Sequence, residues 1–367
     1  MTELRNSPLH AKHEELGASF TPFGAWNMPL KYGKELDEHR AVREKVGIFD
    51  LSHMGEFRVT GPDAAALLDY TLISTLSSAA IGQAKYSMIT EEDGGIIDDL
   101  ITYRLGEEEF LVVPNASNID PVWEAFTERA KKFENVELAN ESNDTALIAV
   151  QGPRAEEVLL KIADESDADA IRELKYYRCV PLTLAGHDIL LARTGYTGED
   201  GFELFLPATE APALWDTVVE AAAEFEATVC GLAARDSLRL EAAMPLYGNE
   251  LSRDITPVEA DMGRAFAKKE ADFVGKHALI NRERSGAIVG LTSEQRRAAR
   301  AGSEVFVGDK KIGTVTSGQP SPTLGHPIAL ALVDVDHTAV GTEVEVDIRG
   351  KRYPFTICER PFYKRAK

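Results

Sequence analysis

A short motif occurs twice in this chain, and its repetition limits the folds that the chain can adopt. Residues 59–68 and 150–160 both begin V-x-G-P-x-A and both continue in the apolar rhythm of a helix. Each copy indicates a strand, a glycine turn and a helix, because proline fits the first helical turn, where its missing N–H costs nothing. A hairpin pattern, a strand and a second helix follow each copy. The repeated order predicts a duplicated core.

The same pattern predicts the fold class. Two units of this order indicate an α+β fold, in which helices cover one face of antiparallel sheets in the manner of a ferredoxin-like layer. A helix from Leu232 to about Met244 and a linker-like stretch come next. Short strands then alternate with Gly, Pro and Asp turns, which is typical of a small antiparallel barrel or sandwich. The expected strands of this third domain are residues 288–291, 304–307, 311–317, 328–333, 343–348 and 352–358.

Composition excludes several classes of protein. Residues 1–6 lack the apolar segment of a signal peptide, and no run approaches the roughly 20 apolar residues of a membrane helix, so a soluble, cytoplasmic protein is expected. A net charge of −20 disfavours binding to nucleic acid or to an anionic membrane. Cys179, Cys230 and Cys358 are far apart in sequence, which argues against a disulfide framework or a zinc site and predicts small buried residues.

The C-terminal part is locally basic although the chain as a whole is acidic. Two interpretations of this bias stay open: a solvated face, or a site for an anionic tail. The residues concerned are Arg296, Arg297, Arg300, Lys310, Lys311, Lys351, Arg352, Arg360, Lys364 and Arg365.

Two adjacent carboxylates lie inside a segment that otherwise reads as a buried strand. Residues 96–105 follow a turn at residues 91–95 and a strand-like run, so a hairpin is expected. Side chains of a strand alternate between its two faces. Asp98 then lies where it can pair with Arg104 or reach water. Asp99 lies on the more apolar face, together with Ile97, Ile101, Tyr103 and Leu105.

Burial makes Asp99 a candidate functional residue. An ionised carboxylate without partners costs several kcal/mol to bury, roughly, so this group must be protonated, paired or facing a ligand. One interpretation is structural, with Asp99 capping a loop or accepting backbone N–H groups. The other places it in a site, and the pattern alone leaves both open.

The other candidates are weaker when taken singly. Residues 193–203 form a glycine-rich turn between two strands but lack the following helix that a nucleotide motif requires. Glu203 alternates with buried positions, and an exposed strand glutamate is its simplest interpretation. Arg235 lies in a helix whose charged residues are typical of a solvated face. His53 is interpreted as structural, and no nucleophilic or metal-binding arrangement stands out.

Five motifs, in one order and spread over almost the whole chain, resemble the glycine cleavage T-protein family, the aminomethyltransferases. Each motif is moderately specific, and the five in order are highly specific. They are D-L-S-H-M-G at residues 50–55, the run at 94–100, G-Y-T-G-E at 195–199, the run at 231–241 and G-T-V-T-S-G at 313–318.

The resemblance implies a cloverleaf of three domains around a central folate site. With the repeat, it predicts a discontinuous first α+β domain (residues 1–50 and 150–270), a second α+β domain (51–149) and a C-terminal β-barrel (280–367). It also implies transfer of the one-carbon unit from an aminomethyl group on the lipoyl arm of H-protein to tetrahydrofolate, which yields 5,10-methylenetetrahydrofolate and ammonia. Tetrahydrofolate is then the cosubstrate, lipoylated H-protein the partner, and no metal is expected.

The resemblance assigns roles residue by residue. Asp99 matches the catalytic aspartate, and we expect it to orient the folate amine and stabilise developing positive charge rather than to abstract a proton directly. A pterin presents an N–H and an amino group side by side, an edge that a carboxylate such as Glu203 accepts bidentately. Arg235 adds a donor fork for a carbonyl or carboxylate. The remaining contacts implied are Tyr86, Tyr196, Asn115 and, more weakly, Tyr177.

Two rival functions are less well supported. A folate-dependent demethylating oxidase carries an additional flavin-binding region, and no G-x-G-x-x-G follows a strand in this sequence. A folate-binding regulatory or iron-sulfur assembly protein of related fold shows a Lys-Gly-Cys motif near the linker. Residues 273–277 of this chain read F-V-G-K-H, without cysteine, which favours the transferase.

Overall fold

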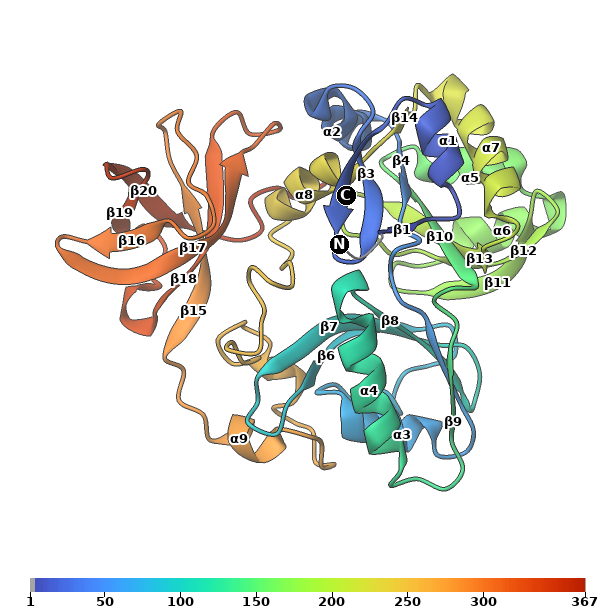
Figure 1. Ribbon diagram of the computed structural model, residues 1–367, viewed down its shortest axis with the longest axis horizontal. Coiled ribbons are helices and arrows are strands. Elements are labelled where there is room, and N and C mark those ends of the chain that lie inside the picture. The colour runs from blue at the N-terminus through green and yellow to red at the C-terminus, as the bar shows by residue number, and fades with distance from the viewer. Residues whose placement is uncertain (1–3, 367) are drawn as a thin grey trace.

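The computed structural model describes residues 4–366 and contains two α+β units and a β-barrel (Figure 1). Residues 1–3, part of the segment without a signal-peptide pattern, and Lys367 lie outside the described residues. The N-terminal segment forms a small sheet in the order β1-β3-β2, and β3 packs against α8 (Leu232–Glu241). Its elements are β1 (Arg5–Asn6), α1 (His10–Glu15), β2 (Ser19–Phe23), β3 (Trp26–Lys31) and α2 (Glu35–Glu44).

The first α+β unit is built on a sheet in the order β11-β12-β13-β10-β4-β14, called here the first sheet. All its neighbouring strands are antiparallel except the pair β4 and β14, which is parallel. Its elements are β4 (Gly47–Asp50), β10 (Thr145–Gln151), α5 (Ala155–Ile162), α6 (Glu165–Glu173), β11 (Cys179–Leu184), β12 (His187–Ala192), β13 (Gly201–Pro207), α7 (Ala211–Ala222) and β14 (Thr228–Val229).

The second α+β unit is built on an antiparallel sheet in the order β6-β7-β8-β5-β9, called here the second sheet. Its block β6-β7-β8-β5 has the order of β11-β12-β13-β10, so the predicted duplicated core is confirmed. This unit, strand-helix-strand-strand-strand-helix-strand, contains one strand more than the six elements of a ferredoxin-like layer. The elements are β5 (Phe57–Thr60), α3 (Ala64–Thr71), β6 (Ala84–Thr90), β7 (Ile96–Arg104), β8 (Glu109–Pro114), α4 (Ile119–Ala130) and β9 (Glu137–Asn140).

The repeated motif forms the same tight turn in both units. Gly61 and Gly152 have φ of 109° and 133°, and a Cβ added to Gly152 would lie 2.5 Å from the carbonyl oxygen of Lys45. In each copy the backbone N–H of the alanine that follows three residues after the glycine, Ala64 or Ala155, donates to the carbonyl of that glycine. Proline therefore occupies the second position of a β-turn, where its fixed φ is favoured. The prediction that it lies in the first helical turn is wrong, because α3 and α5 begin two residues later.

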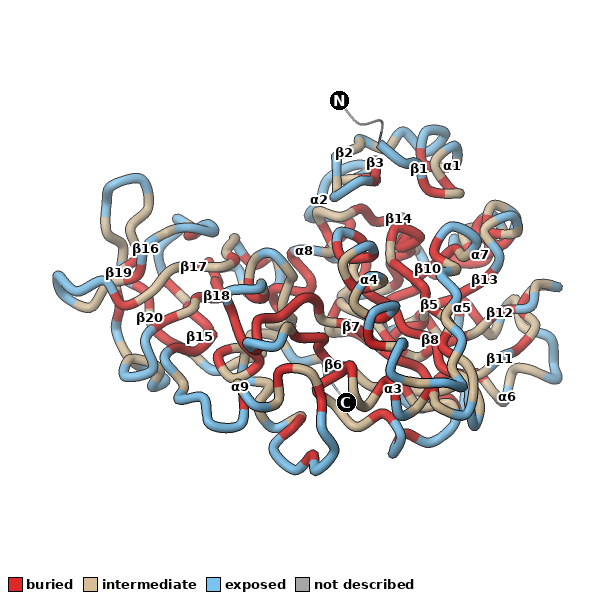
Figure 2. Tube along the Cα trace, turned by 60° about the horizontal axis from the view of Figure 1, so that its bottom comes forward, coloured by how far each residue is buried: buried red, intermediate tan, exposed pale blue. Residues whose placement is uncertain are grey.

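Each sheet is covered by helices on one face only. The outer face of the first sheet packs against α5, α6 and α7, and that of the second sheet against α3 and α4. The two uncovered faces pack against each other through Leu147 and Phe205 of the first sheet and Leu111 and Val113 of the second. Figure 2 shows the buried trace along the strands of both units. The core of the molecule is therefore continuous from one sheet to the other.

The C-terminal part is a closed six-stranded antiparallel barrel in the order β15-β18-β17-β16-β19-β20. The predicted third domain and its strands are confirmed. In Figure 1 the barrel lies apart from the two α+β units, with α8 between them. The elements that complete the chain are α9 (Lys276–Ile280), β15 (Gly286–Thr292), β16 (Glu304–Val307), β17 (Lys310–Pro320), β18 (Pro327–Asp334), β19 (Glu343–Asp347) and β20 (Arg352–Cys358). The exact residue boundaries of the three domains stay a prediction.

Part of the basic C-terminal stretch belongs to a solvated face. Exposed Lys311 pairs with Glu304 at 2.7 Å, and Lys310 pairs with Asp334 at 3.3 Å, both on the barrel surface. Such exposed pairs contribute little to stability. No helix within residues 4–366 is long and apolar enough to cross a membrane.

The three cysteines are free, and two of them are buried as predicted. Cys179 lies between the two sheets and Cys230 lies below α2, whereas Cys358 is only half-buried. Burial raises the pKa of the Cys179 thiol to about 12 and that of Cys358 to about 11. Thiols with raised pKa are poor nucleophiles at neutral pH, in keeping with a structural role.

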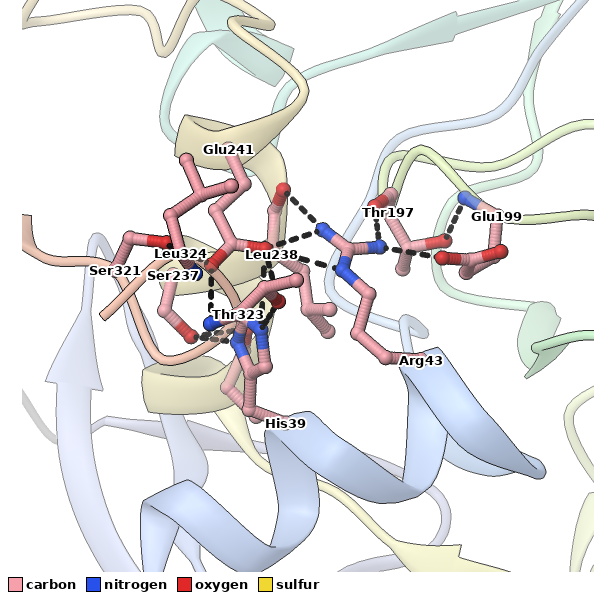
Figure 3. A network of polar contacts seen from close by, with 11 residues as sticks. His39, Arg43, Thr197, Glu199, Ser237, Leu238, Glu241, Ser321, Thr323 and Leu324 are labelled. Carbon is pink, nitrogen blue, oxygen red and sulfur yellow. Dashed lines mark hydrogen bonds and ion pairs between the residues drawn. The ribbon is translucent and has the colours of Figure 1, made fainter. Parts of the chain in front are cut away.

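A buried carboxylate joins the barrel to the α+β units (Figure 3). Glu241, at the end of α8, accepts hydrogen bonds from Arg43 of α2 at 2.9 and 3.0 Å. It also accepts from the backbone N–H of Thr323 at 3.0 Å, its hydroxyl at 2.7 Å and the Ser321 hydroxyl, all in the β17–β18 loop of the barrel. His39 of α2 lies 3.2 Å from the carboxylate. Three elements distant in sequence therefore meet on one side chain.

This network predicts a pH-dependent contribution of Glu241 to stability. Burial by itself raises the pKa of Glu241, but the donors from His39, Ser321 and Arg43 outweigh it and lower the pKa to about 2. Glu241→Gln should lower the free energy of unfolding at pH 7 by about 3 kcal/mol. Because the folded-state pKa lies below the ordinary value, this difference should shrink as pH falls from about 4.5 to about 2.

Chemical denaturation of both proteins over this pH range measures the effect. Glu343→Gln, an exposed position on β19, is the matched control and should change stability by no more than about 0.5 kcal/mol. A stability difference for Glu241→Gln that stays constant down to pH 2 would contradict the assigned role.

Candidate active site

A cavity of about 280 Å³ lies between the two sheets, beside α8. Met244, Pro245 and Leu246, which follow α8, form part of its wall, and Phe23 of β2 forms another part. All seven residues singled out from the sequence line this one cavity. They are Tyr86 on β6, Asp99 on β7, Asn115 after β8, Tyr177 before β11, Tyr196 before β13, Glu203 on β13 and Arg235 on α8.

Asp99 faces the cavity and is held by two donors. The Tyr86 hydroxyl donates to its Oδ2 at 2.9 Å, and Nδ2 of Asn115 donates to its Oδ1 at 2.9 Å. Burial raises the pKa of Asp99 to about 6, although both hydrogen bonds oppose the shift. The carboxylate is therefore ionised at neutral pH and close to the range in which it exchanges a proton. Its orientation is fixed before any ligand arrives.

Asp98 does not pair with Arg104 and does not reach water, so that prediction is wrong. It is fully buried and accepts hydrogen bonds from the backbone N–H and Nδ2 of Asn115, both at 2.9 Å, and from Nδ2 of Asn118 at 2.6 Å. Arg104 donates instead to backbone carbonyls, among them that of Ala79 at 2.8 Å. The start of α4 brings Asn118 beneath Asp98, a contact that strand alternation does not reveal. Burial and the charge of Asp99 raise the pKa of Asp98.

A β-bulge also corrects the predicted faces of β7. Ile89 pairs with Asp98 and Thr90 with Ile96, which leaves Ile97 without a partner on β6. Ile97 consequently packs in the helix-covered core of the second sheet and not beside Asp99. Beyond the bulge, Ile101, Tyr103 and Leu105 face the first sheet, on the side of Asp99, as predicted. One extra residue shifts the alternation by one position, and nothing in the sequence pattern marks it.

Glu203 is half-buried and lines the cavity, so its interpretation as an exposed strand residue is wrong. Its neighbours Phe202 and Leu204 pack into the outer core of the first sheet, and Glu203 faces the opposite way. Opposite it on the two adjacent strands are Ala149 and Ala192, whose small side chains leave room for the carboxylate. Burial raises the pKa of Glu203.

The partners of Glu203 leave part of its carboxylate available. The Thr194 hydroxyl donates to Oε2, and the Tyr103 hydroxyl lies 3.4 Å from the same oxygen. Within residues 4–366 no hydrogen bond reaches Oε1. The second oxygen is therefore free to accept from a ligand.

Arg235 presents an unpaired guanidinium to the same cavity, so it does not belong to a solvated helix face. Its Cζ lies 4.7 Å from the centre of the Tyr196 ring, a cation–π contact. Among the described residues it forms no ion pair within 4.0 Å, and burial lowers its pKa. Two opposite charges, Arg235 and Glu203, therefore share one cavity without neutralising each other by direct contact.

The loop that carries Tyr196 is fixed from outside the cavity. Arg43 donates to the carbonyl of Thr197 at 2.7 Å and to Glu199 at 3.0 Å, as Figure 3 shows, and Tyr196 itself donates to the carbonyl of Pro245. The network around Glu241 thus also positions an aromatic wall of the cavity.

Sequence reasoning missed several residues of the wall. His53, interpreted as structural, lines the cavity together with Leu51 and Met54. These three belong to the turn between β4 and β5, where the chain crosses from the first sheet to the second. The motif D-L-S-H-M-G was the available signal, but a single histidine beside apolar residues is not distinctive.

The arrangement is suited to a flat, polar ligand that carries both donors and acceptors. Two carboxylates, Asp99 and Glu203, offer acceptors from two different strands, and Arg235 offers donors. Tyr86, Tyr177 and Tyr196 supply aromatic surface. Within residues 4–366 no group of three or more His, Cys, Asp or Glu residues is placed to hold a metal ion.

Comparisons with known proteins identify the family. The family model described as the GCVT N-terminal domain matches residues 9–270, and that of the glycine cleavage T-protein C-terminal barrel domain matches residues 287–364. The chain is 62% identical to an aminomethyltransferase of Corynebacterium aurimucosum and 52% identical to one of Cutibacterium acnes, with 100% of each chain covered in both cases. The crystal structure of the glycine cleavage system aminomethyltransferase T from Bartonella henselae superposes with a TM-score of 0.90 at 37% identity and 98% coverage of both chains. The chain belongs to the glycine cleavage T-protein family.

Proposed function

We propose that this chain is the aminomethyltransferase of a glycine cleavage system and that the cavity between the two sheets is its active site. It transfers the one-carbon unit of the aminomethyl group on the H-protein lipoyl arm to tetrahydrofolate, which gives 5,10-methylenetetrahydrofolate and releases ammonia. One observation supports this assignment above the others: Asp99 and Glu203, from the two repeated units, face the same cavity as Arg235.

The charges of the cavity match the chemistry of a reduced pterin. The ring N–H and the adjacent amino group of the pterin form a donor edge, and we assign that edge to Glu203, whose Oε1 accepts no hydrogen bond from the described residues. Arg235 then donates to an acceptor of the folate. Tyr86, Tyr177 and Tyr196 contact the ring, and Asn115 holds Asp99 in place.

Asp99 acts on the reacting atoms chiefly by position and charge. When the aminomethyl carbon moves from sulfur to a folate nitrogen, positive charge develops on nitrogen, and a carboxylate held nearby stabilises it. Tyr86 and Asn115 fix the carboxylate, so little reorganisation is needed during the reaction. Correct placement of two reactants can lower a barrier by roughly 7 to 11 kcal/mol, more than proton transfer contributes. We therefore assign Asp99 to orientation of the folate amine and to charge stabilisation.

The partner and surroundings follow from the same assignment. Lipoylated H-protein delivers the aminomethyl group, tetrahydrofolate is a cosubstrate, no metal takes part, and the enzyme works in the cytoplasm. The competing function is a folate-binding regulatory or assembly protein without transferase activity. The absence of cysteine from residues 273–277 favours the transferase.

A product assay decides between these two functions. The protein, H-protein loaded with the aminomethyl group, and tetrahydrofolate should together release ammonia and 5,10-methylenetetrahydrofolate in equal amounts. Omitting any one of the three should abolish both products. Binding of tetrahydrofolate without release of ammonia would support the regulatory alternative instead.

Glu203→Ala should weaken tetrahydrofolate binding by about 1.5 to 3 kcal/mol, because a charge-assisted hydrogen-bond pair is lost. Calorimetric titration under anaerobic conditions measures the change. Glu220→Ala, at an exposed position of α7, is the control and should leave the affinity unchanged. An unaltered dissociation constant in a folded Glu203→Ala protein would remove Glu203 from the binding site.

Asp99→Asn should lower kcat by about two to three orders of magnitude while changing the affinity for tetrahydrofolate only slightly, since it removes charge and keeps size. The wild-type kcat/KM should fall as pH drops below about 6, where Asp99 becomes protonated, and the variant should lack this dependence.

Asp98→Asn is the comparison for this experiment. Asp98 holds Asn115 and Asn118 without lining the cavity, so its replacement should lower thermal stability more than kcat. An inactive Asp98→Asn enzyme beside an active Asp99→Asn enzyme would reverse the two assignments.

A further inference from the structure

His53 is a buried polar residue of the cavity that the roles assigned so far do not use. The residue is 1% exposed, yet it lines the same cavity as Asp99 and Arg235. Its Nδ1 is cut off from solvent and has no hydrogen-bond partner within the described part of the chain. Buried polar atoms are nearly always paired, so an unpaired one in the wall of a binding cavity calls for an explanation.

The position of His53 is fixed, so the unpaired nitrogen does not reflect a loose loop. Asp50 accepts from the backbone N–H of Ser52 at 2.9 Å, and the N–H of Leu51 donates to Leu147 of β10 at 2.8 Å. On the other side, the N–H of Gly55 donates to Pro114 of β8 at 3.0 Å. The turn is thus attached to both sheets. The imidazole and the Phe23 ring form a T-shaped contact, with ring centres 5.4 Å apart and planes at 87°.

The surroundings of His53 determine which nitrogen carries the proton. Burial, reinforced by the charge of Arg235, lowers the pKa of His53 to about 4, so the imidazole is neutral at neutral pH. A neutral imidazole has one N–H donor and one acceptor. An unpaired buried N–H is rarer than an unpaired acceptor, which places the proton on Nε2 and leaves Nδ1 as the unpaired acceptor. Nε2–H is then the donor that the cavity can use.

The chemistry of the pterin edge indicates which ligand atom receives this donor. Along that edge the amino group and ring N–H are followed by the ring carbonyl and then by the reacting ring nitrogen. Glu203 takes the first two groups and Asp99 lies at the last, so the carbonyl falls between them and requires a donor. The charge of Arg235 acts on both Glu203 and His53, which places these three residues in one neighbourhood.

We propose that His53 is a further binding residue, whose Nε2–H donates to the ring carbonyl of bound tetrahydrofolate beside Arg235 and selects the 4-oxo form of the ligand. This assignment rests on the proposed function. It gives the imidazole a partner in the complex, and it lets the site distinguish a carbonyl from an amino group, because only the carbonyl accepts a hydrogen bond.

Three variants and two ligands test the proposal. Dissociation constants are measured for tetrahydrofolate and for its 4-amino analogue, with melting temperatures to verify folding. His53→Leu should weaken tetrahydrofolate about fivefold to tenfold and leave the analogue within about twofold, because one neutral hydrogen bond is lost. His53→Gln, whose amide nitrogen takes the place of Nε2, should restore most of the affinity. His53→Asn, whose amide takes the place of Nδ1, should not.

Each outcome bears on one of the two proposals. The role of His53 would be overturned if His53→Leu weakened the binding of both ligands equally, or if the Gln and Asn variants behaved alike. Unchanged affinity for tetrahydrofolate in any folded variant without the Nε2 donor would overturn it as well. If the Leu variant does not fold, the comparison of Gln with Asn still decides. A wild-type protein that fails to bind tetrahydrofolate would instead overturn the proposed function itself.

Discussion

The packing of one repeated sheet on the other is the constraint on which the rest of this structure depends. Helices cover only one face of each sheet, so each unit alone would expose an apolar surface to water. Leu147 and Phe205 of one sheet meet Leu111 and Val113 of the other, which buries both surfaces at once. A cavity remains between the sheets beside Glu203, whose neighbours on the adjacent strands are the small residues Ala149 and Ala192.

A polar network outside the cavity helps to hold α8, the helix that carries Arg235 of the cavity wall. Glu241 interacts with Arg43 and His39 of α2 and accepts hydrogen bonds from the β17–β18 loop, while Arg43 extends the network to the loop of Tyr196. Removing one member of such a cluster leaves the others buried without a partner, which is why its members act as a unit. The barrel therefore supports the position of α8, and with it that of Arg235, without lining the cavity.

The charged side chains of the cavity lower the stability of the folded protein. Asp99, Glu203 and Arg235 are charged groups placed where burial disfavours charge, and each lacks a full set of protein partners. Asp98 and Asn115 form a supporting layer that holds Asp99 in place. Groups retained at such a cost, in one cavity, are typical of binding and catalytic sites. This cost, more than any single motif, supports the proposal that the cavity is the active site.

The sequence by itself determined what depends on local periodicity: the duplicated order of elements, the barrel strands, and the fact that Glu203 leaves the helix-covered core of its sheet. Tertiary structure decided what those residues meet. The alternation of side chains along a strand shows which of them point away from the helix-covered core. It does not show that a second sheet packs against the opposite face, so Glu203 was interpreted as exposed. The alternation pattern also does not reveal the β-bulge at Ile97 or the hydrogen bond from Asn118 to Asp98. These features arise from contacts between segments distant in the chain, whose pairing no local pattern encodes.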